Sequence, residues 1–423
     1  MENSVKTTKF KGDRVIWIVF FFLCLISIIE VFSASSNLSF NSGNYLKPVL
    51  KHCGILFIGI IAMLFIMNIK CKYFKVVTPF ALFFSFIGLI AVFFLGETTN
   101  GSQRWLSFLG IQFQPSELAK GALVLATAQI LSAMQTVNGA DKHAFKYILI
   151  ISLFMIGPIA VENLSTAILL AFVVFLMMFI GKVPKAQLGK LMGVVMVAVV
   201  LFLTAVLTLG NDKSAETQNE TTDKEISINA EPKKESTFEK VFHRFDTWKA
   251  RIVKFVDKKE VAPEDVDLDK DAQTSHANIA IASSNLVGKG PGNSVARDFL
   301  SQAFSDFIYA IIIEEMGILG AAGVCFLYII LLFRTANIAN KCVNTFTALL
   351  IMGFALLLVV QALFNMAVAV GLVPVTGQPL PLISKGGTST IVNCAYIGII
   401  LSVSYSAKKK DDLTANNDVK PEP

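Results

Sequence analysis

Charged residues are scarce in this chain of 423 residues: Asp, Glu, Lys and Arg together make up 16 %, against roughly 25 % in an ordinary soluble domain. Hydrophobic residues make up 54 %, and the mean hydropathy is +0.62. A soluble domain or a disordered segment keeps far more of its sequence polar. The composition therefore excludes a soluble globular enzyme and an intrinsically disordered protein.

Cysteine is also sparse, and its spacing excludes two further classes. No two cysteines form a CxxC pair, and none lies in the one long hydrophilic segment. A disulfide scaffold or a zinc site needs clustered cysteines, so we interpret these residues as small apolar side chains within the membrane. They are Cys24, Cys53, Cys71, Cys325, Cys342 and Cys394.

Long apolar runs take up most of the sequence. A helix that crosses the ~30 Å hydrocarbon core of a bilayer needs about 20 consecutive apolar residues. Ten runs approach this length, so the sequence predicts an all-α polytopic membrane protein with about ten transmembrane helices. The runs are 15–34, 49–69, 78–95, 118–133, 145–161, 164–180, 191–209, 307–333, 346–372 and 391–405.

The first run follows Lys6, Lys9, Lys11 and Arg14, an order of parts that a signal peptide shares. The apolar core of a signal peptide is only about 7–15 residues long. The run 15–34 exceeds that length, so we interpret it as an uncleaved span.

Positive charge indicates how the spans are oriented. Lys and Arg outnumber Asp and Glu by 37 to 31, a net charge of +6, and in a polytopic protein such an excess marks cytoplasmic loops rather than a nucleic-acid partner. Basic residues gather in alternate short loops, which places both termini in the cytoplasm. The residues on that side are Lys6, Lys9, Lys11, Arg14, Lys70, Lys72, Lys75, Lys142, Lys146, Lys182, Lys185, Lys190, Arg334, Lys341, Lys408, Lys409 and Lys410.

The same analysis divides the chain into four segments. Seven helices in 1–209 precede a large extracytoplasmic loop, 210–305, and three helices in 306–406 precede a cytoplasmic tail, 407–423. The loop begins with a polar low-complexity part, too poor in apolar residues to fold alone. A stretch from Phe242 to Phe255 then has the three-to-four spacing of an amphipathic helix, which could lie on the membrane surface or pack on the bundle.

Polar side chains at membrane depth are costly, so each polar cluster beside a span is a candidate functional site. In the first cluster, Arg104 adjoins the interfacial anchor Trp105, and Glu117 and Lys120 stand three residues apart on one helix face. The alternative is a Glu–Lys pair that only stabilises a helix start, and the residues alone leave both open.

The second cluster, Glu162 and Asn163, occupies the tight turn between the fifth and sixth spans. Here the simpler explanation is that Asn163 or Ser165 caps the sixth helix. Taken alone, this motif favours capping over a functional role.

The third cluster closes the long loop. The segment 288–294 is rich in glycine and contains Asn293 and Ser294; glycine permits sharp turns and close approach to a ligand. No GK[ST] ends the segment, so it is not a P-loop. Asp306 follows, where the chain re-enters the membrane. This place suits a carboxylate general base. The alternative is that Asp306 is the N-cap of span eight.

The fourth cluster follows the ninth span. Three prolines and two glycines in 371–381 precede Ser384, Lys385, Gly386 and Gly387. Irregular backbone at membrane depth is tolerated only against protein or a water-filled cavity. The pattern predicts a broken, re-entrant segment rather than a plain hairpin turn.

Together the four clusters resemble the SEDS family (shape, elongation, division, sporulation) of bacterial peptidoglycan glycosyltransferases, which includes FtsW and RodA. Residues 101–105 resemble the family's GxxRW, 114–120 match QPSExxK, 304–310 resemble HTDFIFA, and 371–387 match GLxPxTGxxLPxxSxGG. The segment 288–294 is similar to the GxGxGNS of FtsW-like members.

The chain departs from the family pattern at four positions. Asn163 stands where the family has Asp, with Glu162 beside it. Phe304 replaces the usual His, Ser305 the usual Thr, and Lys385 the common Tyr. The change at Asn163 removes a carboxylate unless Glu162 takes its place.

The resemblance implies that the protein polymerises lipid II into glycan strands of septal peptidoglycan, in the bacterial cytoplasmic (inner) membrane. A RodA-like elongation polymerase is the nearest alternative. A lipid II flippase or another transporter would also use broken helices and buried acids. A scaffold that only recruits a partner is the third class.

The resemblance also implies roles for single residues. Asp306 would be the general base, Arg104 and Lys120 would stabilise the leaving pyrophosphate, and Glu117 would orient Lys120. A divalent cation, Mg²⁺ or Mn²⁺, is compatible with this chemistry, with Glu117 and Asp306 as its candidate ligands. The residues expected at the substrate are Arg104, Glu117, Lys120, Glu162, Asn163, Asn293, Ser294, Ser384, Lys385, Gly386 and Gly387.

The expected partners follow from the FtsW-like signature. They are a class B penicillin-binding protein, which is a single-span transpeptidase, and other proteins of the division complex; no nucleic acid is expected. The apolar eighth and ninth spans would offer lipid-facing surface on which the partner's helix could pack.

The predicted topology can be tested by cysteine labelling in a variant whose natural cysteines have been replaced. A cysteine at Asn219 should react with a membrane-impermeant maleimide in intact cells, and one at Asn417 should react only after lysis, because basic residues retain the termini inside. Labelling of the second site alone in intact cells would show that the orientation is reversed.

Overall fold

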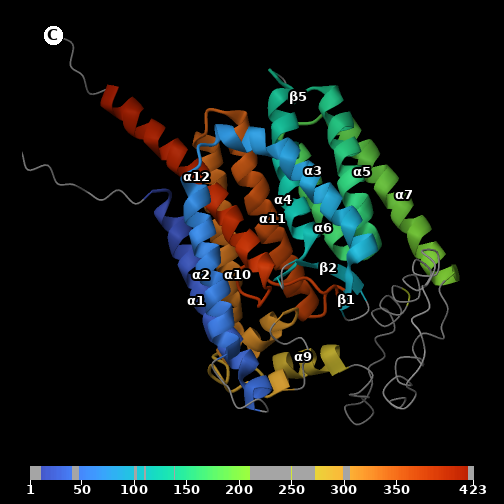
Figure 1. Ribbon diagram of the computed structural model, residues 1–423, viewed down its shortest axis with the longest axis vertical. Helices are drawn as coiled ribbons and strands as arrows, with labels where there is room; N and C mark the ends of the chain where they lie inside the picture. The colour runs from blue at the N-terminus through green and yellow to red at the C-terminus, as the bar shows by residue number, and fades with distance from the viewer. Residues whose placement is uncertain are drawn as a thin grey trace, which may run out of the picture.

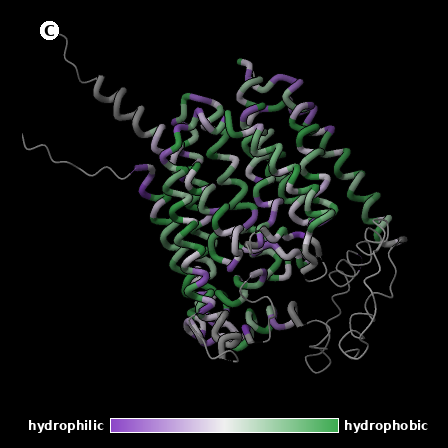
Figure 2. The backbone as a smooth tube through the Cα atoms, viewed as in Figure 1, coloured by the Kyte–Doolittle hydropathy of each residue, from purple (hydrophilic) through white to green (hydrophobic). Residues whose placement is uncertain are grey.

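The computed structural model describes residues 11–40, 47–99, 102–108, 111–137, 139–209, 249, 272–298 and 305–417. In these ranges the chain is a bundle of long helices (Figure 1). The strands between 97 and 113 and helix α9 (Ala272–Ala282) lie toward one end, and the strand pair between 135 and 140 lies at the other. Hydrophobic residues follow the helices along their length, and hydrophilic residues gather toward the helix ends (Figure 2). The all-α polytopic membrane class is confirmed.

The long helices coincide with the predicted spans. Within the described ranges, eight helices are long and apolar enough to cross a membrane. Helix α6 has 17 residues and α4 carries a Glu and a Lys, so the count of ten spans stays a prediction. The helices are α1 Arg14–Phe40, α2 Lys47–Met67, α3 Lys72–Leu95, α4 Pro115–Ala133, α5 Lys142–Glu162, α6 Leu164–Ile180, α7 Lys185–Leu209, α10 Ile308–Lys341, α11 Thr345–Ala369 and α12 Thr388–Asn417.

The first helices of the chain pack against the last ones: α1 lies against α10, and α2 lies along α12. The backbone N–H of Asp13 donates to Ser404 Oγ at 3.0 Å, and the Arg334 guanidinium binds both carboxylate oxygens of Asp13 at 2.7–3.0 Å. The start of α1 and this part of α12 therefore lie at the same end of the bundle. The predicted topology requires this arrangement, and the assignment of that end to the cytoplasm stays a prediction.

Helix α11 is the centre of the bundle. It contacts α4, α6, α10 and α12, and 72 % of its most apolar window is buried, against 6 % for the peripheral helix α7. The expectation that span nine offers a broad lipid-facing surface is therefore wrong. Helix α10 does expose apolar side chains, namely Ile318, Leu319, Phe326, Ile329 and Phe333.

Short strands occupy two connections for which the residue pattern predicts no strand. Strands β1 (Glu97–Thr99), β2 (Ser102–Phe108) and β3 (Ile111–Phe113) form an antiparallel meander between α3 and α4. Strands β4 (Gln135–Thr136) and β5 (Gly139–Ala140) form a small hairpin between α4 and α5. Pairing satisfies the backbone of these connections, and β2 carries Arg104 toward the bundle.

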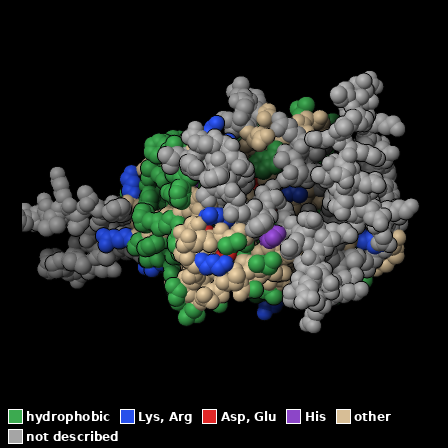
Figure 3. Space-filling view, turned by 90° about the horizontal axis from the view of Figure 1, so that it is seen from below, with side chains coloured by type: hydrophobic (Ala, Val, Ile, Leu, Met, Phe, Trp, Pro, Cys, Tyr) green, Lys and Arg blue, Asp and Glu red, His purple; other side chains and the backbone are tan. Residues whose placement is uncertain are grey.

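The large loop is described only near its end. Its low-complexity part and the predicted amphipathic helix 242–255 lie outside the described residues, apart from Lys249. Helix α9 (Ala272–Ala282) packs on α10 and was not predicted. Figure 3 looks onto this end of the molecule, where Lys and Arg side chains lie among polar surface atoms of the described part.

A break within α10 positions the glycine-rich loop. Gly317 has φ +69 and ψ −177, which interrupts the helix. The carbonyl oxygens of Glu314 and Glu315, freed by the break, accept hydrogen bonds from the N–H groups of Lys289 and Gly290 at 3.0 and 2.8 Å. A Cβ on Gly317 would lie only 2.4 Å from the Leu286 carbonyl oxygen, so this contact requires glycine.

We predict that Gly317→Ala lowers the free energy of unfolding by at least about 1–3 kcal/mol, because a left-handed non-glycine residue is strained and its Cβ meets loop backbone. The matched control is Gly323→Ala in the same helix, where an added Cβ meets nothing within 4 Å. Thermal unfolding in one detergent measures both. Equal midpoints for the two variants would contradict the assigned role of Gly317.

Candidate active site

The segment between α11 and α12 has no regular secondary structure, yet much of it is buried. Thr376, Gln378, Leu380 and Ser384 are each at most 6 % exposed. An apolar segment with buried polar side chains enters the bundle instead of turning at its surface. The geometry therefore agrees with the re-entrant segment that the prolines and glycines predict.

Amide side chains of α11 hold this segment in place. Asn365 Nδ2 donates to the carbonyl oxygens of Asp306 and Gln378 at 2.9 and 2.6 Å. Gln361 Nε2 donates to the Pro379 carbonyl at 3.1 Å. These bonds satisfy carbonyl groups that a bilayer interior would otherwise leave unpaired.

Ser384 joins the re-entrant segment to the chain that precedes α10. Its hydroxyl accepts a hydrogen bond from Leu380 N–H at 2.8 Å and donates to the Ser305 carbonyl at 2.6 Å. Ser305 Oγ in turn donates to Asp306 Oδ1 at 3.0 Å. Ser384, a predicted site residue, thus contacts the residue beside Asp306.

Asp306 and Arg104 meet at one glycine. A Cβ built on Gly377, which has φ +67, would lie 3.4 Å from Asp306 Oδ2 and 3.6 Å from Arg104 Nη1. Three segments far apart in sequence therefore converge where Gly377 leaves room. Asp306 is not the N-cap of α10, since that residue is Phe307, so the capping alternative does not describe it.

Glu117 and Lys120 form the predicted pair, and the pair is buried. Lys120 Nζ lies 2.8 Å from Glu117 Oε1 and 2.8 Å from Gln361 Oε1, with no exposed surface. The other oxygen of the carboxylate, Glu117 Oε2, is buried and has no hydrogen-bond partner among the described residues. Lys120 therefore links α4 to α11.

Asn163 caps helix α6, as its simpler interpretation predicts. Its Oδ1 accepts a hydrogen bond from Thr166 N–H at 3.2 Å. Thr166 Oγ1 then accepts from Gln378 Nε2 at 2.6 Å, which ties this helix start to the re-entrant segment. Glu162 is buried at the end of α5. This cluster supports the segment that carries Gly377.

Asn293 and Ser294 belong to a separate clamp on α10. Ser294 Oγ donates to Glu314 Oε2 at 2.5 Å, and Lys289 Nζ pairs with Glu314 Oε1 at 2.6 Å. Asn293 Nδ2 donates to the Lys289 carbonyl at 3.0 Å. These contacts stabilise the glycine-rich loop, and none of them involves Asp306.

Lys385, Gly386 and Gly387 lead into α12. Gly386 O accepts hydrogen bonds from the N–H and the hydroxyl of Ser389 at 3.1 and 2.8 Å, which forms the first turn. Burial, with a smaller contribution from the charge of Lys51, lowers the pKa of Lys385.

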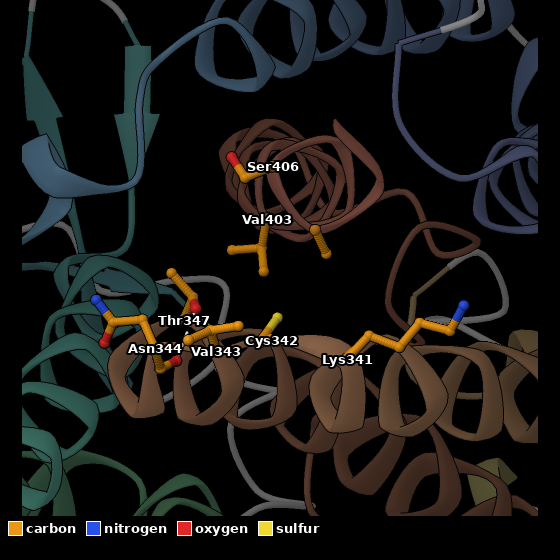
Figure 4. Close-up of a pocket in the computed structure, with 8 residues that line it drawn as sticks. Lys341, Cys342, Val343, Asn344, Thr347, Val403 and Ser406 are labelled. Carbon is orange, nitrogen blue, oxygen red and sulfur yellow. Dashed lines mark hydrogen bonds between the residues drawn. The ribbon is translucent and has the colours of Figure 1, made fainter. Parts of the chain in front are cut away.

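Three amides support the site without having been expected at the substrate, although Asn365 opens the fourth polar cluster of the sequence. Gln361 and Asn365 stand four residues apart in an otherwise apolar span, and Gln378 lies within the re-entrant segment. The four-residue spacing of Gln361 and Asn365, which places both on one helix face, was the sequence signal for this role. A cavity of about 320 Å³ at the opposite end, lined partly by Cys342, Val403 and Ser406, contains no predicted site residue (Figure 4).

A model of the family described as "Cell cycle protein", which covers FtsW, RodA and SpoVE, matches residues 13–224 and 236–409. The chain belongs to this family. The motifs around Arg104, Glu117, Asp306 and Gly377 all fall within the matched ranges, so the resemblance seen in the sequence is confirmed.

Relatives of this FtsW/RodA/SpoVE-family chain carry enzyme names. The peptidoglycan glycosyltransferase MrdB of Escherichia coli K12 is 26 % identical, with 94 % of both chains covered. The probable peptidoglycan glycosyltransferase FtsW of Geobacter sp. strain M18 is 28 % identical, with 93 % of this chain and 96 % of the relative covered. The prediction of a peptidoglycan glycosyltransferase is confirmed, and a septal rather than elongation role stays a proposal.

Two solved structures share the fold of this family member. One is a chain from a peptidoglycan synthase complex that coordinates polymerization and crosslinking, with a TM-score of 0.68, 21 % identity and 94 % and 98 % of the two chains covered. The other is RodA of Thermus thermophilus, with a TM-score of 0.60, 21 % identity and 93 % and 96 % covered.

We predict that Lys120→Met lowers the free energy of unfolding by about 3–5 kcal/mol, because it leaves the Glu117 carboxylate buried without its cation. The double variant with Glu117→Gln should recover about 1–3 kcal/mol of that loss. Denaturant unfolding in detergent of the wild type, the two single variants and the double variant measures this double-mutant cycle. Strictly additive effects would show that the two side chains do not interact.

Proposed function

We propose that this family member polymerises lipid II into septal glycan strands in the bacterial cytoplasmic membrane. The observation that carries the proposal is the meeting of the Asp306 carboxylate and the Arg104 guanidinium beside Gly377. A base and a fixed cation at one point, inside a membrane protein, suit a lipid substrate whose leaving group is a pyrophosphate.

Asp306 is proposed as the general base. The acceptor sugar's hydroxyl must lose a proton as it attacks the anomeric carbon of the donor, and a carboxylate within hydrogen-bond reach can take that proton. Hydrogen bonds from Ser305 and Asn365 fix the side chain and backbone of Asp306. A fixed base holds the reacting hydroxyl in one orientation, which lowers the entropic part of the barrier.

Arg104 is proposed to stabilise the negative charge that develops on the departing pyrophosphate. A guanidinium can bind two phosphate oxygens at once. Lys120 takes a different role from the one first expected, because Glu117 and Gln361 already bind it in the interior. It holds Glu117 so that Oε2 of that carboxylate stays free.

The donor set is compatible with a divalent cation that is shared with the substrate. Within the described ranges no group of three His, Cys, Asp or Glu side chains could hold a metal, but Mg²⁺ is commonly bound by one or two carboxylates together with substrate phosphates. Glu117 and Asp306 are the proposed ligands. When bound, such a cation would supply charge stabilisation to the leaving pyrophosphate.

A lipid flippase is the second candidate, because a broken segment inside the bundle is also typical of transporters. Glycan synthesis by purified protein in detergent separates the two, since flipping forms no glycosidic bond. Purified protein that moves labelled lipid II across a vesicle membrane and makes no polymer would support the flippase.

We predict that Asp306→Asn folds and inserts normally but polymerises lipid II roughly 10²–10⁴-fold more slowly, because an amide cannot accept the proton. Asn344→Ala is the comparison variant, since it alters the cap at the start of α11 and leaves the carboxylate intact. Polymer length and rate on gels measure both. Near-normal polymerisation by folded Asp306→Asn would remove Asp306 from the catalytic role and favour Glu117.

We also predict that a class B penicillin-binding protein, a single-span transpeptidase, co-purifies with the protein from native membranes. Its helix would pack on α10, whose exposed face is apolar, and packing of small and apolar surfaces drives such association. Phe326→Arg on that face should reduce recovery of the partner. Recovery of an elongation-type transpeptidase alone would favour a RodA-like role.

A further inference from the structure

Two polar side chains from the start of the chain reach the re-entrant segment and have no role in the site described above. Ser27 of α1 and His52 of α2 have no exposed surface. Ser27 Oγ donates to the Ile383 carbonyl at 2.7 Å, and His52 Nε2 lies 2.8 Å from Ser27 Oγ. Ser27 therefore binds the carbonyl of the residue that precedes Ser384, and His52 binds Ser27.

The protons of this pair can be assigned from its partners. A carbonyl oxygen can only accept, so the single hydroxyl proton of Ser27 points to Ile383 O. The remaining contact then requires His52 Nε2–H to donate to Ser27 Oγ. His52 Nδ1 is buried and has no hydrogen-bond partner among the described residues, so the ring is the neutral Nε2–H tautomer. Its donated bond orients the serine hydroxyl.

The backbone that this pair holds is strained. Leu382 has φ +67, a left-handed conformation that is unfavourable for a residue with a Cβ. The Pro381 carbonyl before it accepts a hydrogen bond from the Tyr328 hydroxyl, and the Ile383 carbonyl after it accepts from Ser27. Strain of this kind persists only when the surroundings hold it, so α10 and α1 fix the turn from both sides.

The turn leads directly to Asp306. Ser384 follows Ile383, and its hydroxyl donates to the carbonyl of Ser305 at 2.6 Å. A relaxed turn at Leu382 would move Ser384 and release that carbonyl, and the carboxylate of Asp306 lies on the next residue. A displacement of about 1 Å at a reacting group can cost roughly 10²-fold in rate.

We propose that Ser27 and His52 are positioning residues for the polymerisation: they hold the strained turn at Leu382, and through Ser384 they fix Asp306 relative to Gly377. This inference rests on the proposed role of Asp306 as the base. The helices α1 and α2 remain attached elsewhere, through Asp13 and through the packing of α2 on α12. Loss of one hydroxyl should therefore displace the turn without unfolding the bundle.

The test compares Ser27→Ala with Ser152→Ala in purified full-length protein. Both changes delete a buried serine hydroxyl in a long helix, but in the described part of the chain the hydroxyl of Ser152 in α5 has no hydrogen-bond partner. We expect Ser27→Ala to lower kcat for lipid II polymerisation roughly 10–100-fold with KM unchanged. Ser152→Ala should match the wild type, and Ser27→Thr should restore most of the rate because it keeps the hydroxyl.

A second readout does not depend on activity. Hydrogen exchange of the Leu380 and Ser384 amides, which are bonded within the turn, should be faster in Ser27→Ala than in Ser152→Ala. At the histidine, His52→Gln keeps an N–H donor and should retain more activity than His52→Leu. If Ser27→Ala fails to fold, the comparison of His52→Gln with His52→Leu replaces it.

The proposal is overturned if Ser27→Ala has the kcat and the exchange rates of the wild type. It is also overturned if Ser27→Ala raises KM and leaves kcat unchanged, or if His52→Gln and His52→Leu are equally active. Full activity of Asp306→Asn would instead defeat the proposed function, and faster exchange in Ser27→Ala would then still show that the pair holds the turn.

Discussion

The whole structure depends on one constraint: backbone polar groups inside a membrane protein must find partners within the protein. The segment between α11 and α12 has no helix or strand to pair its backbone polar groups, so side chains bind them instead. Asn365 and Gln361 bond its carbonyl groups from α11, Tyr328 from α10, and Ser27 from α1. These amides and hydroxyls, which lie in otherwise apolar helices, stabilise the irregular segment. That segment in turn places Gly377 beside Asp306.

Hydropathy and the polar motifs predicted the long helices and the re-entrant segment, because a ~30 Å apolar core imposes length and apolarity on every span. The same argument could not predict the β1–β3 meander or α9, whose short segments carry little periodic signal. It also left open whether the Glu117–Lys120 pair only stabilises a helix start, and it did not identify Gln361 as the α11 amide that binds Lys120. Those outcomes depend on how distant helices are placed, which local sequence does not encode.

The acidic pair Glu314–Glu315 illustrates the difference between a motif and its role. Adjacent carboxylates beside a candidate base suggest chemistry, but the loop 288–296 surrounds both with N–H groups, a lysine and a serine. Buried carboxylates satisfied in this way act as structural anchors. The anchors and the break at Gly317 together determine where the chain enters α10, and thereby where Asp306 lies.

The packing of α1 on α10 and of α2 on α12 has a consequence for how the protein is made. Ser27 and its partner Ile383 are 356 residues apart in the chain. At a synthesis rate of about 5–20 residues per second, the first helices wait roughly 20–70 s in the membrane before their partners are inserted. Native contacts of such high sequence separation form last. During that interval the polar faces of α1 and α2 require temporary shelter from lipid, by the insertion machinery or by each other.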